Sequence, residues 1–314
     1  MAVHTFIFPG QGSQSVGMGR DLAAAFADAR EVFEEVDETL KFKLSKLMFE
    51  GPAEDLTLTE NTQPALMAVS LAVLRVIERE GGLKLASRAV LVAGHSLGEY
   101  SALAAAGSLR ITEAAQLLRE RGLAMQRAVP AGEGAMAALI GVEMPLVAEI
   151  CAEAAGSEVV QPANDNGGGQ VVISGHRAAV ERALEIARGR GVRRAMLLPV
   201  SAPFHCALMA PAAEAVREAL GRVRLAAPVV PLIANISAAQ ASDPAEIADL
   251  LVRQVTGTVR WRESVLAMAA IGVDSFVELG AGRVLSGLVR RILPDAAVHA
   301  VATPNEIEAL LRLL

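Results

Sequence analysis

The sequence contains few aromatic residues, so its core must be built from aliphatic side chains. Phenylalanine, tyrosine and tryptophan make up 3% of the 314 residues, whereas hydrophobic residues as a whole make up 53%. Cores of alanine, leucine, valine and isoleucine are typical of parallel sheets covered by helices. The chain is also long enough for one large domain, or for a large domain with a smaller one inserted. These features predict an α/β protein.

The sequence also lacks a basic excess, a cysteine pattern and a long apolar run. Its net charge is −6 at pH 7 and no block is rich in lysine or arginine, so nucleic acid is not an expected partner. Cys151 and Cys206 are neither paired nor spaced as metal ligands, which predicts a reducing compartment and no metal site. The sequence starts without a charged and then apolar leader, and no segment reaches about 18 uninterrupted apolar residues. We therefore expect a cytoplasmic protein without membrane contact.

Short runs rich in β-branched residues alternate with longer amphipathic stretches, which predicts a mostly parallel sheet. Strands are expected at residues 4–8, 89–93, 229–234 and 275–279. A helix is expected to begin at Asn61-Thr62-Gln63-Pro64, because a capping side chain there precedes a proline that needs no helical N–H.

The segment from Gly134 to Val200 interrupts this alternation. Its order is strand, helix, strand, strand, helix, strand, which is the ferredoxin-like split motif. We expect this βαββαβ subdomain, residues 132–200, to be inserted into a catalytic domain formed by residues 1–131 and 201–314. A cleft is expected between the two parts.

A candidate nucleophile lies where the second expected strand meets a helix. The sequence Gly94-His95-Ser96-Leu97-Gly98 is a G-x-S-x-G elbow, the turn that exposes a serine hydroxyl in α/β-hydrolases. An α/β-hydrolase-like core is therefore expected. Glycines flank the serine because the turn is strained, and the Leu97 N–H at the helix start can donate to an oxyanion. The alternative is a serine that only caps the helix.

A serine nucleophile needs a base within hydrogen-bonding reach. His205, in SAPFHCALM, lies where the insert returns the chain to the main domain, so we expect it to face the cleft. His299 is the rival, because ordinary hydrolases place their histidine late in the chain. Cys206 is expected to be a small buried residue. Structural roles are expected for His4, His95 and His176, and the side chain of His95 is expected to point away from the site.

Arg121 lies on a helix face that is otherwise apolar, formed by Ala114, Leu118, Met125 and Ala128. A guanidinium that points inward needs an anionic partner, because burying it alone costs several kcal/mol. Two partners remain open on this reasoning. One is a structural ion pair with an aspartate or glutamate, and the other is the carboxylate of a substrate.

Two glycine-rich turns follow strands without matching a nucleotide-binding motif. Pro9-Gly10-Gln11-Gly12 and Gly280-Ala281-Gly282 lack both the P-loop lysine and the third glycine of the dinucleotide fingerprint. We interpret both as tight turns that bring backbone close to a site. Gln11 would offer an amide donor at the strand edge where open α/β sheets bind ligands.

Taken together, several motifs resemble the malonyl-CoA:acyl carrier protein transacylases. The resemblance runs from Phe8 to the end of the chain's last glycine-rich segment, in the order and at the spacing of that family. The motifs are FPGQGSQ, GHSLGEYSAL, Arg121-Gly122, Asn164-Asp165-Asn166 before GQVVISG, SAPFH, Gln254 before VRW, and VELGAGRVLSGL. One departure is the run Asn166-Gly-Gly-Gly, which has more glycine than we expect in that loop.

The resemblance implies that Ser96 is acylated, that His205 rather than His299 is the base, and that Arg121 holds the malonyl carboxylate. Phe204, before the histidine, matches the pattern that accompanies malonyl rather than branched acyl groups. The reaction would be a ping-pong transfer from malonyl-CoA to the phosphopantetheine of acyl carrier protein, for fatty-acid or polyketide synthesis. It would need no metal or redox cofactor, and a monomer is expected.

The resemblance also implies how the other pocket residues act. Gln11 and the Leu97 amide would form the oxyanion hole, and the backbone carbonyl of Gln254 would orient the base in place of a triad acid. The pocket would be lined by Gln63, Asn164 and Asn166. Two alternatives stay open: a serine hydrolase with Asp243 or Asp274 as its acid, and a carrier-binding subunit without catalytic activity.

Overall fold

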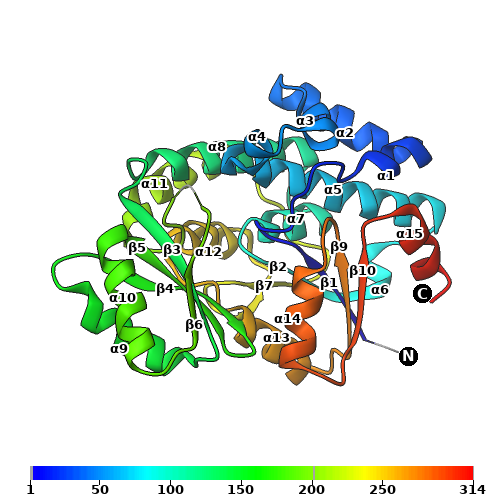
Figure 1. The fold of residues 1–314 in the computed structure, drawn as a ribbon. Coiled ribbons are helices and arrows are strands. Elements are labelled where there is room, and N and C mark those ends of the chain that lie inside the picture. The colour runs from blue at the N-terminus through cyan, green and yellow to red at the C-terminus, as the bar shows by residue number, and fades with distance from the viewer. Residues whose placement is uncertain (1–2, 201, 314) are drawn as a thin grey trace.

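Two β-sheets of different size form the framework of this computed structural model, which describes residues 3–200 and 202–313. The larger sheet has the strand order β10-β9-β1-β2-β7-β8, and its strands are parallel except for β8 at one edge. The other five strands are labelled in Figure 1. Its strands are β1 His4–Phe8, β2 Ala89–Gly94, β7 Leu232–Ala234, β8 Ala239–Ala241, β9 Ser275–Leu279 and β10 Ala297–Val301. The prediction of an α/β protein with a mostly parallel sheet is therefore confirmed.

Helices cover both faces of the larger sheet, because successive side chains of each strand point to opposite sides. Phe6 and Phe8 pack into the core under α2, α5, α7 and α8, whereas Ile7 packs against α13 and α14 on the opposite face. The helices of this part are α1 Arg20–Ala25, α2 Ala27–Leu40, α3 Leu44–Glu50, α4 Ala53–Thr57, α5 Thr59–Glu80, α6 Leu85–Arg88, α7 Gly98–Ala105, α8 Ile111–Arg127, α11 Ala210–Leu220, α12 Pro244–Thr256, α13 Trp261–Ala270, α14 Val284–Ile292 and α15 Pro304–Leu311, with a short 3-10 helix at Ala207–Met209.

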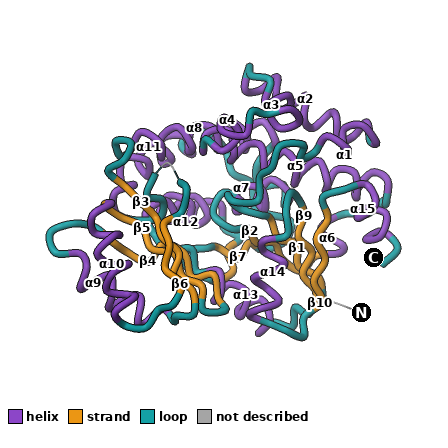
Figure 2. Tube along the Cα trace, in the orientation of Figure 1, coloured by secondary structure: helices purple, strands orange, loops and turns teal. Residues whose placement is uncertain are grey.

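The smaller sheet is antiparallel and has the order β4-β5-β3-β6 (Figure 2). Its elements follow the predicted βαββαβ order: β3 Gly134–Ile140, α9 Met144–Ala155, β4 Val160–Gly167, β5 Gln170–His176, α10 Arg177–Gly189 and β6 Arg194–Leu197. All six lie within the segment 132–200 for which we expected an inserted subdomain. The expected domain limits at residues 1, 201 and 314 lie outside the described residues.

The two faces of the smaller sheet have different partners. One face packs on α9 and α10 and encloses a separate core that includes Leu139, Val171 and Ile173. Side chains of the other face, such as Met136 and Val172, belong to the core of the main part. The insert therefore places one face of its sheet against the main part, near the carboxyl ends of the main strands, where the elbow lies.

Three details of the sequence prediction were wrong or incomplete. Helix α5 begins at Thr59 rather than after Asn61, whose side chain donates to the Asp55 carbonyl instead of capping the helix. Pro64 thus lies inside the helix, where it has no N–H to donate to the Glu60 carbonyl. This carbonyl accepts instead from Arg119 Nη1 at 3.1 Å. Strand β7 starts at Leu232, after a proline, and β8 and β10 were not predicted.

No helix within the described ranges is both long and apolar enough to span a membrane.

Candidate active site

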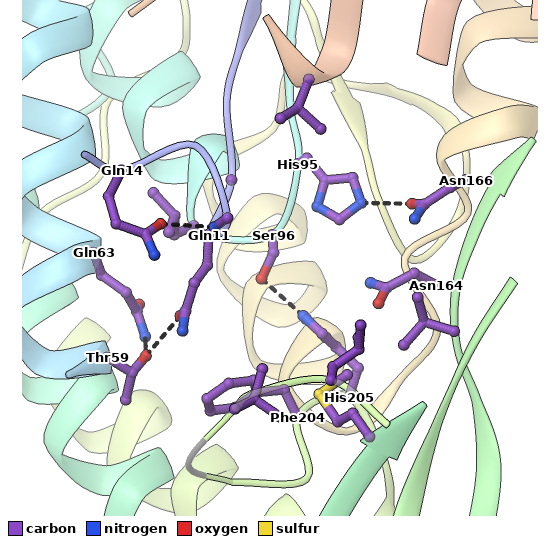
Figure 3. A pocket seen from close by; sticks show the side chains of 18 of the residues that line it. Gln11, Gln14, Thr59, Gln63, His95, Ser96, Asn164, Asn166, Phe204 and His205 are labelled. Atoms are coloured by element: carbon purple, nitrogen blue, oxygen red, sulfur yellow. Dashed lines mark hydrogen bonds between the residues drawn. The ribbon is translucent and has the colours of Figure 1, made fainter. Parts of the chain in front are cut away.

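A pocket of about 550 Å³ lies where the elbow and the turn after β1 face the insert. Its walls include Gln11 and Ser96 from the main part (Figure 3). Met136 and Val172 line it from the insert. This is the cleft expected from the insertion, at the carboxyl ends of β1 and β2, where open α/β sheets bind ligands.

The elbow holds Ser96 in a strained conformation that only its surroundings allow. Ser96 has a φ of 54°, between the end of β2 and the start of α7. A Cβ on Gly94 would lie 2.0 Å from the Gly98 backbone, and one on Gly98 would lie 2.2 Å from the Phe8 carbonyl oxygen. The Ser96 N–H donates to Asn235 Oδ1 at 2.7 Å. The turn therefore requires both glycines and presents the hydroxyl to the pocket.

His205 lies within hydrogen-bonding distance of that hydroxyl. Its Nε2 is 2.7 Å from Ser96 Oγ, and its Nδ1 is 2.9 Å from the carbonyl oxygen of Gln254. Because a carbonyl can only accept, Nδ1 carries the ring proton and Nε2 accepts from the serine hydroxyl. Burial, and then the charge of Arg121, lower the pKa of His205 to about 3, so the imidazole is neutral and its Nε2 carries no proton.

The other histidine and the carboxylates that we considered lie elsewhere. His299 is on β10, the edge strand that β9 and β1 separate from β2. Asp243 caps α12 by accepting from the Ala245 and Glu246 amides, and Asp274 accepts from the Val3 amide. The bond to the Gln254 carbonyl occupies the position that a triad acid holds in hydrolases.

Arg121 is buried in this pocket, and its guanidinium bonds only to neutral groups. Nη1 donates to Gln63 Oε1 at 2.7 Å, and Nη2 donates to Ser96 Oγ at 3.1 Å and to Gln254 Oε1 at 2.9 Å. Its Cζ lies 5.6 Å from the centroid of the Tyr100 ring. Among the residues that the structure describes, no carboxylate forms an ion pair with it and its Nε has no hydrogen-bond partner. The structural ion pair that the sequence left open is therefore absent there.

Two backbone amides beside the serine are available to an oxyanion. In the described chain, neither the N–H of Leu97 nor that of Gln11 donates to a protein acceptor, and both residues line the pocket. The side-chain oxygen of Gln11 accepts from Thr59 Oγ1 at 3.0 Å. A Cβ on Gly10 would lie 2.6 Å from the His95 carbonyl oxygen, so this turn brings backbone close to the site, as expected.

The remaining expected residues line other parts of the pocket. Gln63 accepts from Arg121 and donates to Thr59 Oγ1 at 2.9 Å, which fixes its amide. Asn164 and Asn166 line the pocket from β4. Phe204 lines it beside the histidine.

The orientation that we expected for His95 was wrong. Its ring lines the pocket rather than pointing away from it, because Nε2 pairs with Asn166 Oδ1 at 3.0 Å (Figure 3). Cys206 is fully buried as predicted, with Sγ 3.2 Å from the Pro203 carbonyl oxygen.

The glycine run after Asn166 has a structural reason. Gly167, Gly168 and Gly169 have φ values of 75°, 58° and 71°, and a Cβ on Gly167 would lie 2.5 Å from Ile292 of α14. Only glycine combines this conformation with such close packing.

The sequence analysis missed two buried residues beneath the elbow, Glu99 and Asn235. Asn235 accepts from the Ser96 N–H, and Glu99 Oε2 accepts from Gln254 Nε2 at 2.7 Å. The signal for Glu99 was its position three residues after the serine, in the first turn of the helix that follows the elbow. Asn235 follows β7 and had no local signal.

Comparison with known proteins defines the class of this chain. The acyl transferase domain family matches residues 5–304. This match, together with the fold, places the chain among the acyltransferases.

Individual relatives are similar over the whole length. The chain is 45% identical over 313 residues to the malonyl CoA-acyl carrier protein transacylase of Escherichia coli K12, covering 100% of both chains. It is 57% identical to a crystal structure of acyl-carrier-protein S-malonyltransferase from Bartonella henselae, with a TM-score of 0.97 and 99% of each chain covered. A malonyl transacylase in complex with a type II polyketide-synthase acyl-carrier protein is 40% identical, with a TM-score of 0.96 and 100% of each chain covered. The chain belongs to the malonyl-CoA:acyl carrier protein transacylase family.

Proposed function

We propose that this chain transfers a malonyl group from malonyl-CoA to the phosphopantetheine thiol of an acyl carrier protein, through an ester on Ser96. The observation that carries the proposal is Arg121, a buried cation with only neutral partners, 3.1 Å from Ser96 Oγ. A malonyl group bound to that oxygen has a free carboxylate close to its ester carbonyl, within reach of the guanidinium. An acetyl group has nothing for this cation to bind.

In the first half-reaction, His205 Nε2 takes the proton of Ser96 Oγ as the oxygen bonds to the thioester carbon. The carbonyl electron pair moves onto the oxygen, where the amides of Gln11 and Leu97 stabilise it. When the C=O bond re-forms, the C–S bond breaks, and the coenzyme A sulfur receives the proton from His205. The product is a malonyl ester of Ser96.

In the second half-reaction, the phosphopantetheine thiol gives its proton to His205 Nε2 and attacks the ester. Ser96 Oγ leaves and takes that proton back, and the same amides hold the second oxyanion. The Gln254 carbonyl holds the ring in the required tautomer in both steps, through Nδ1 at 2.9 Å. Carbon and sulfur keep their oxidation states throughout, so the transfer needs no redox cofactor. His205 moves the protons and the two amides stabilise the oxyanion, so the proposal assigns no step to a metal.

The remaining pocket residues and the partners complete the proposal. Gln63 holds Arg121, and Asn164 and Asn166 line the substrate pocket from the insert. The solved complex of a relative with its carrier protein supports an acyl carrier protein as partner. We place the chain in the cytoplasm as a monomer, supplying fatty-acid or polyketide synthesis, without a nucleic acid or membrane partner.

Intact mass measurement tests the proposal. The protein is incubated with malonyl-CoA and then with pantetheinylated carrier protein. We expect one malonyl mass to appear on the wild type and pass to the carrier, and none to appear on Ser96→Ala. A malonyl adduct on Ser96→Ala, or release of free malonate without transfer, would overturn it.

A further inference from the structure

Glu99 is a buried carboxylate directly beneath the candidate nucleophile, in the first turn of α7. It is fully buried, and within the described ranges no lysine, arginine or histidine forms an ion pair with it. Burial raises the pKa of Glu99 to about 7, against hydrogen bonds from Gln254 and Asn235 and the charge of Arg121. A carboxylate held this way is costly to the fold, since an apolar residue of similar size would avoid the desolvation. Its position therefore calls for a role other than stability.

The first contact of Glu99 orients the side-chain amide of Gln254. Nε2 of this amide faces three oxygens: Glu99 Oε2 at 2.7 Å, the Ser96 carbonyl at 3.0 Å and Asn235 Oδ1 at 3.3 Å. Its Oε1 faces Arg121 Nη2 at 2.9 Å. A rotated amide would set its NH₂ against the guanidinium and its oxygen against three acceptors. The bond to Glu99 is the shortest of the three, and the carboxylate is the strongest acceptor among them.

The second contact of Glu99 is to the loop after β7. Oε2 also accepts from the backbone N–H of Asn235 at 3.2 Å. The side chain of Asn235 lies between two parts of the elbow, since Oδ1 accepts from the Ser96 N–H at 2.7 Å and Nδ2 donates to the Gly94 carbonyl at 2.7 Å. Oε2 of Glu99 thus contacts both Asn235, which fixes the serine turn, and Gln254, which holds the arginine.

We infer that Glu99 is a positioning residue, which holds the Gln254 amide so that its oxygen aims Arg121 at the acyl carboxylate. This inference rests on the proposed function. Glu99 does not touch the pocket itself, whose lining includes Gln11, Gln63, Ser96 and Arg121 but not Glu99. Its effect passes through Gln254, from Nε2 to Oε1 and then to Nη2 of the arginine. The property required of Glu99 is an acceptor oxygen at this point, which a glutamine also offers.

The test compares Glu99→Ala and Glu99→Gln in the full chain, with kcat/KM measured for malonyl-CoA and acetyl-CoA. We expect Glu99→Ala to lower the ratio of malonyl to acetyl transfer by about tenfold, the effect of one misplaced charged hydrogen bond. We expect Glu99→Gln to keep the ratio within about threefold of the wild type, because its Oε1 accepts from the same two donors. Isosteric rescue is a result that a role in packing alone does not predict.

Glu278 supplies a matched control. It is also a fully buried glutamate with a raised pKa, but its oxygens accept from the Leu285 and Ser286 amides at the start of α14. We expect Glu278→Gln and Glu278→Ala to leave the malonyl to acetyl ratio unchanged, whatever they do to stability.

Three outcomes would overturn the inference: an unchanged ratio in Glu99→Ala, an equal loss of both acyl groups, or a Glu99→Gln variant that loses selectivity. If Glu99→Ala does not fold, Glu99→Gln alone still tests the inference. A lowered malonyl to acetyl ratio in Glu99→Gln would mean that the charge of Glu99, and not its acceptor oxygen, is required. Failure of the proposed function is recognised separately, because the wild type would then carry no malonyl ester on Ser96.

Discussion

Removing the guanidinium of Arg121 tests the acyl specificity of the pocket. In Arg121→Ala, the carboxylate of a bound malonyl group loses its cationic partner, and Gln63 Oε1 and Gln254 Oε1 lose the donors that lie 2.7 and 2.9 Å away. Truncating one partner of a buried, hydrogen-bonded charge pair costs about 2–4 kcal/mol. We therefore expect kcat/KM for malonyl-CoA to fall by about 30- to 1,000-fold.

The same substitution is expected to preserve or raise the activity toward acetyl-CoA. An acetyl group makes no ion pair, and the variant no longer buries an unpaired cation next to it. The assay measures kcat/KM for both thioesters with the same carrier protein, so that the ratio isolates the carboxylate contact.

Arg119→Ala is the matched control for this experiment. Arg119 lies on the same helix, but its Nη1 bonds to the Glu60 carbonyl and the Asn61 side chain, outside the pocket lining. We expect no change in the malonyl to acetyl ratio. The reasoning is refuted if Arg121→Ala lowers both activities by the same factor, because the arginine would then serve the serine or the fold rather than the carboxylate.

Three further predictions follow from the same contacts. Because the pKa of His205 is lowered to about 3, we expect the rate of Ser96 acylation to show no inflection from this group between pH 5.5 and 8 in single-turnover labelling. A decline in rate with a midpoint near pH 6.5 would contradict this if it persists in Glu99→Gln, the variant that lacks the titrating carboxyl of Glu99. The pKa of Glu99 is raised from 4.5 to about 7, so the folded state binds the extra proton and the wild type loses stability relative to Glu99→Gln as the pH rises. Denaturant unfolding should find Glu99→Gln more stable by up to about 3 kcal/mol at pH 8 and equal near pH 4.5, and a constant difference would refute the shift. Gly167→Ala, at a φ of 75° and with its Cβ 2.5 Å from Ile292, should lower the free energy of unfolding by about 1–3 kcal/mol, and an unchanged denaturation midpoint would contradict the packing.

The sequence predicted those features that depend on local patterns. The elbow at Ser96 and the βαββαβ order of the insert were predicted because each is encoded within a short window by glycine spacing or by apolar periodicity. The start of α5 was predicted after Asn61 and lies at Thr59, since the Asn61 side chain bonds to the Asp55 carbonyl rather than capping the helix. Local propensity cannot show which of several possible acceptors a side chain will meet.

Long-range contacts account for the residues that the sequence did not predict. Asn235 accepts a hydrogen bond from the N–H of Ser96, 139 positions away, and Glu99 accepts one from the side chain of Gln254, 155 positions away. His95 lines the pocket because β4 brings Asn166 against its ring, a contact that spans 71 positions. No local pattern joins the two residues of any of these pairs, so only the assembled fold identifies the contacts between them.

A neutral partner for the histidine is consistent with a pocket that must bind an anion. The Ser96 hydroxyl donates to His205 Nε2 at 2.7 Å and accepts from Arg121 Nη2 at 3.1 Å. A triad acid in place of the Gln254 carbonyl would put a negative charge beside the histidine, close to the Arg121 guanidinium. That acid would compete with an acyl carboxylate for the guanidinium. The carbonyl fixes the tautomer of His205 without this competition. Glu99 is a carboxylate whose charge acts on Arg121. The Gln254 amide separates the two, with its oxygen toward the arginine and its nitrogen toward Glu99. The residues around the serine thus keep the cation buried, oriented and available to a carboxylate that arrives with the substrate.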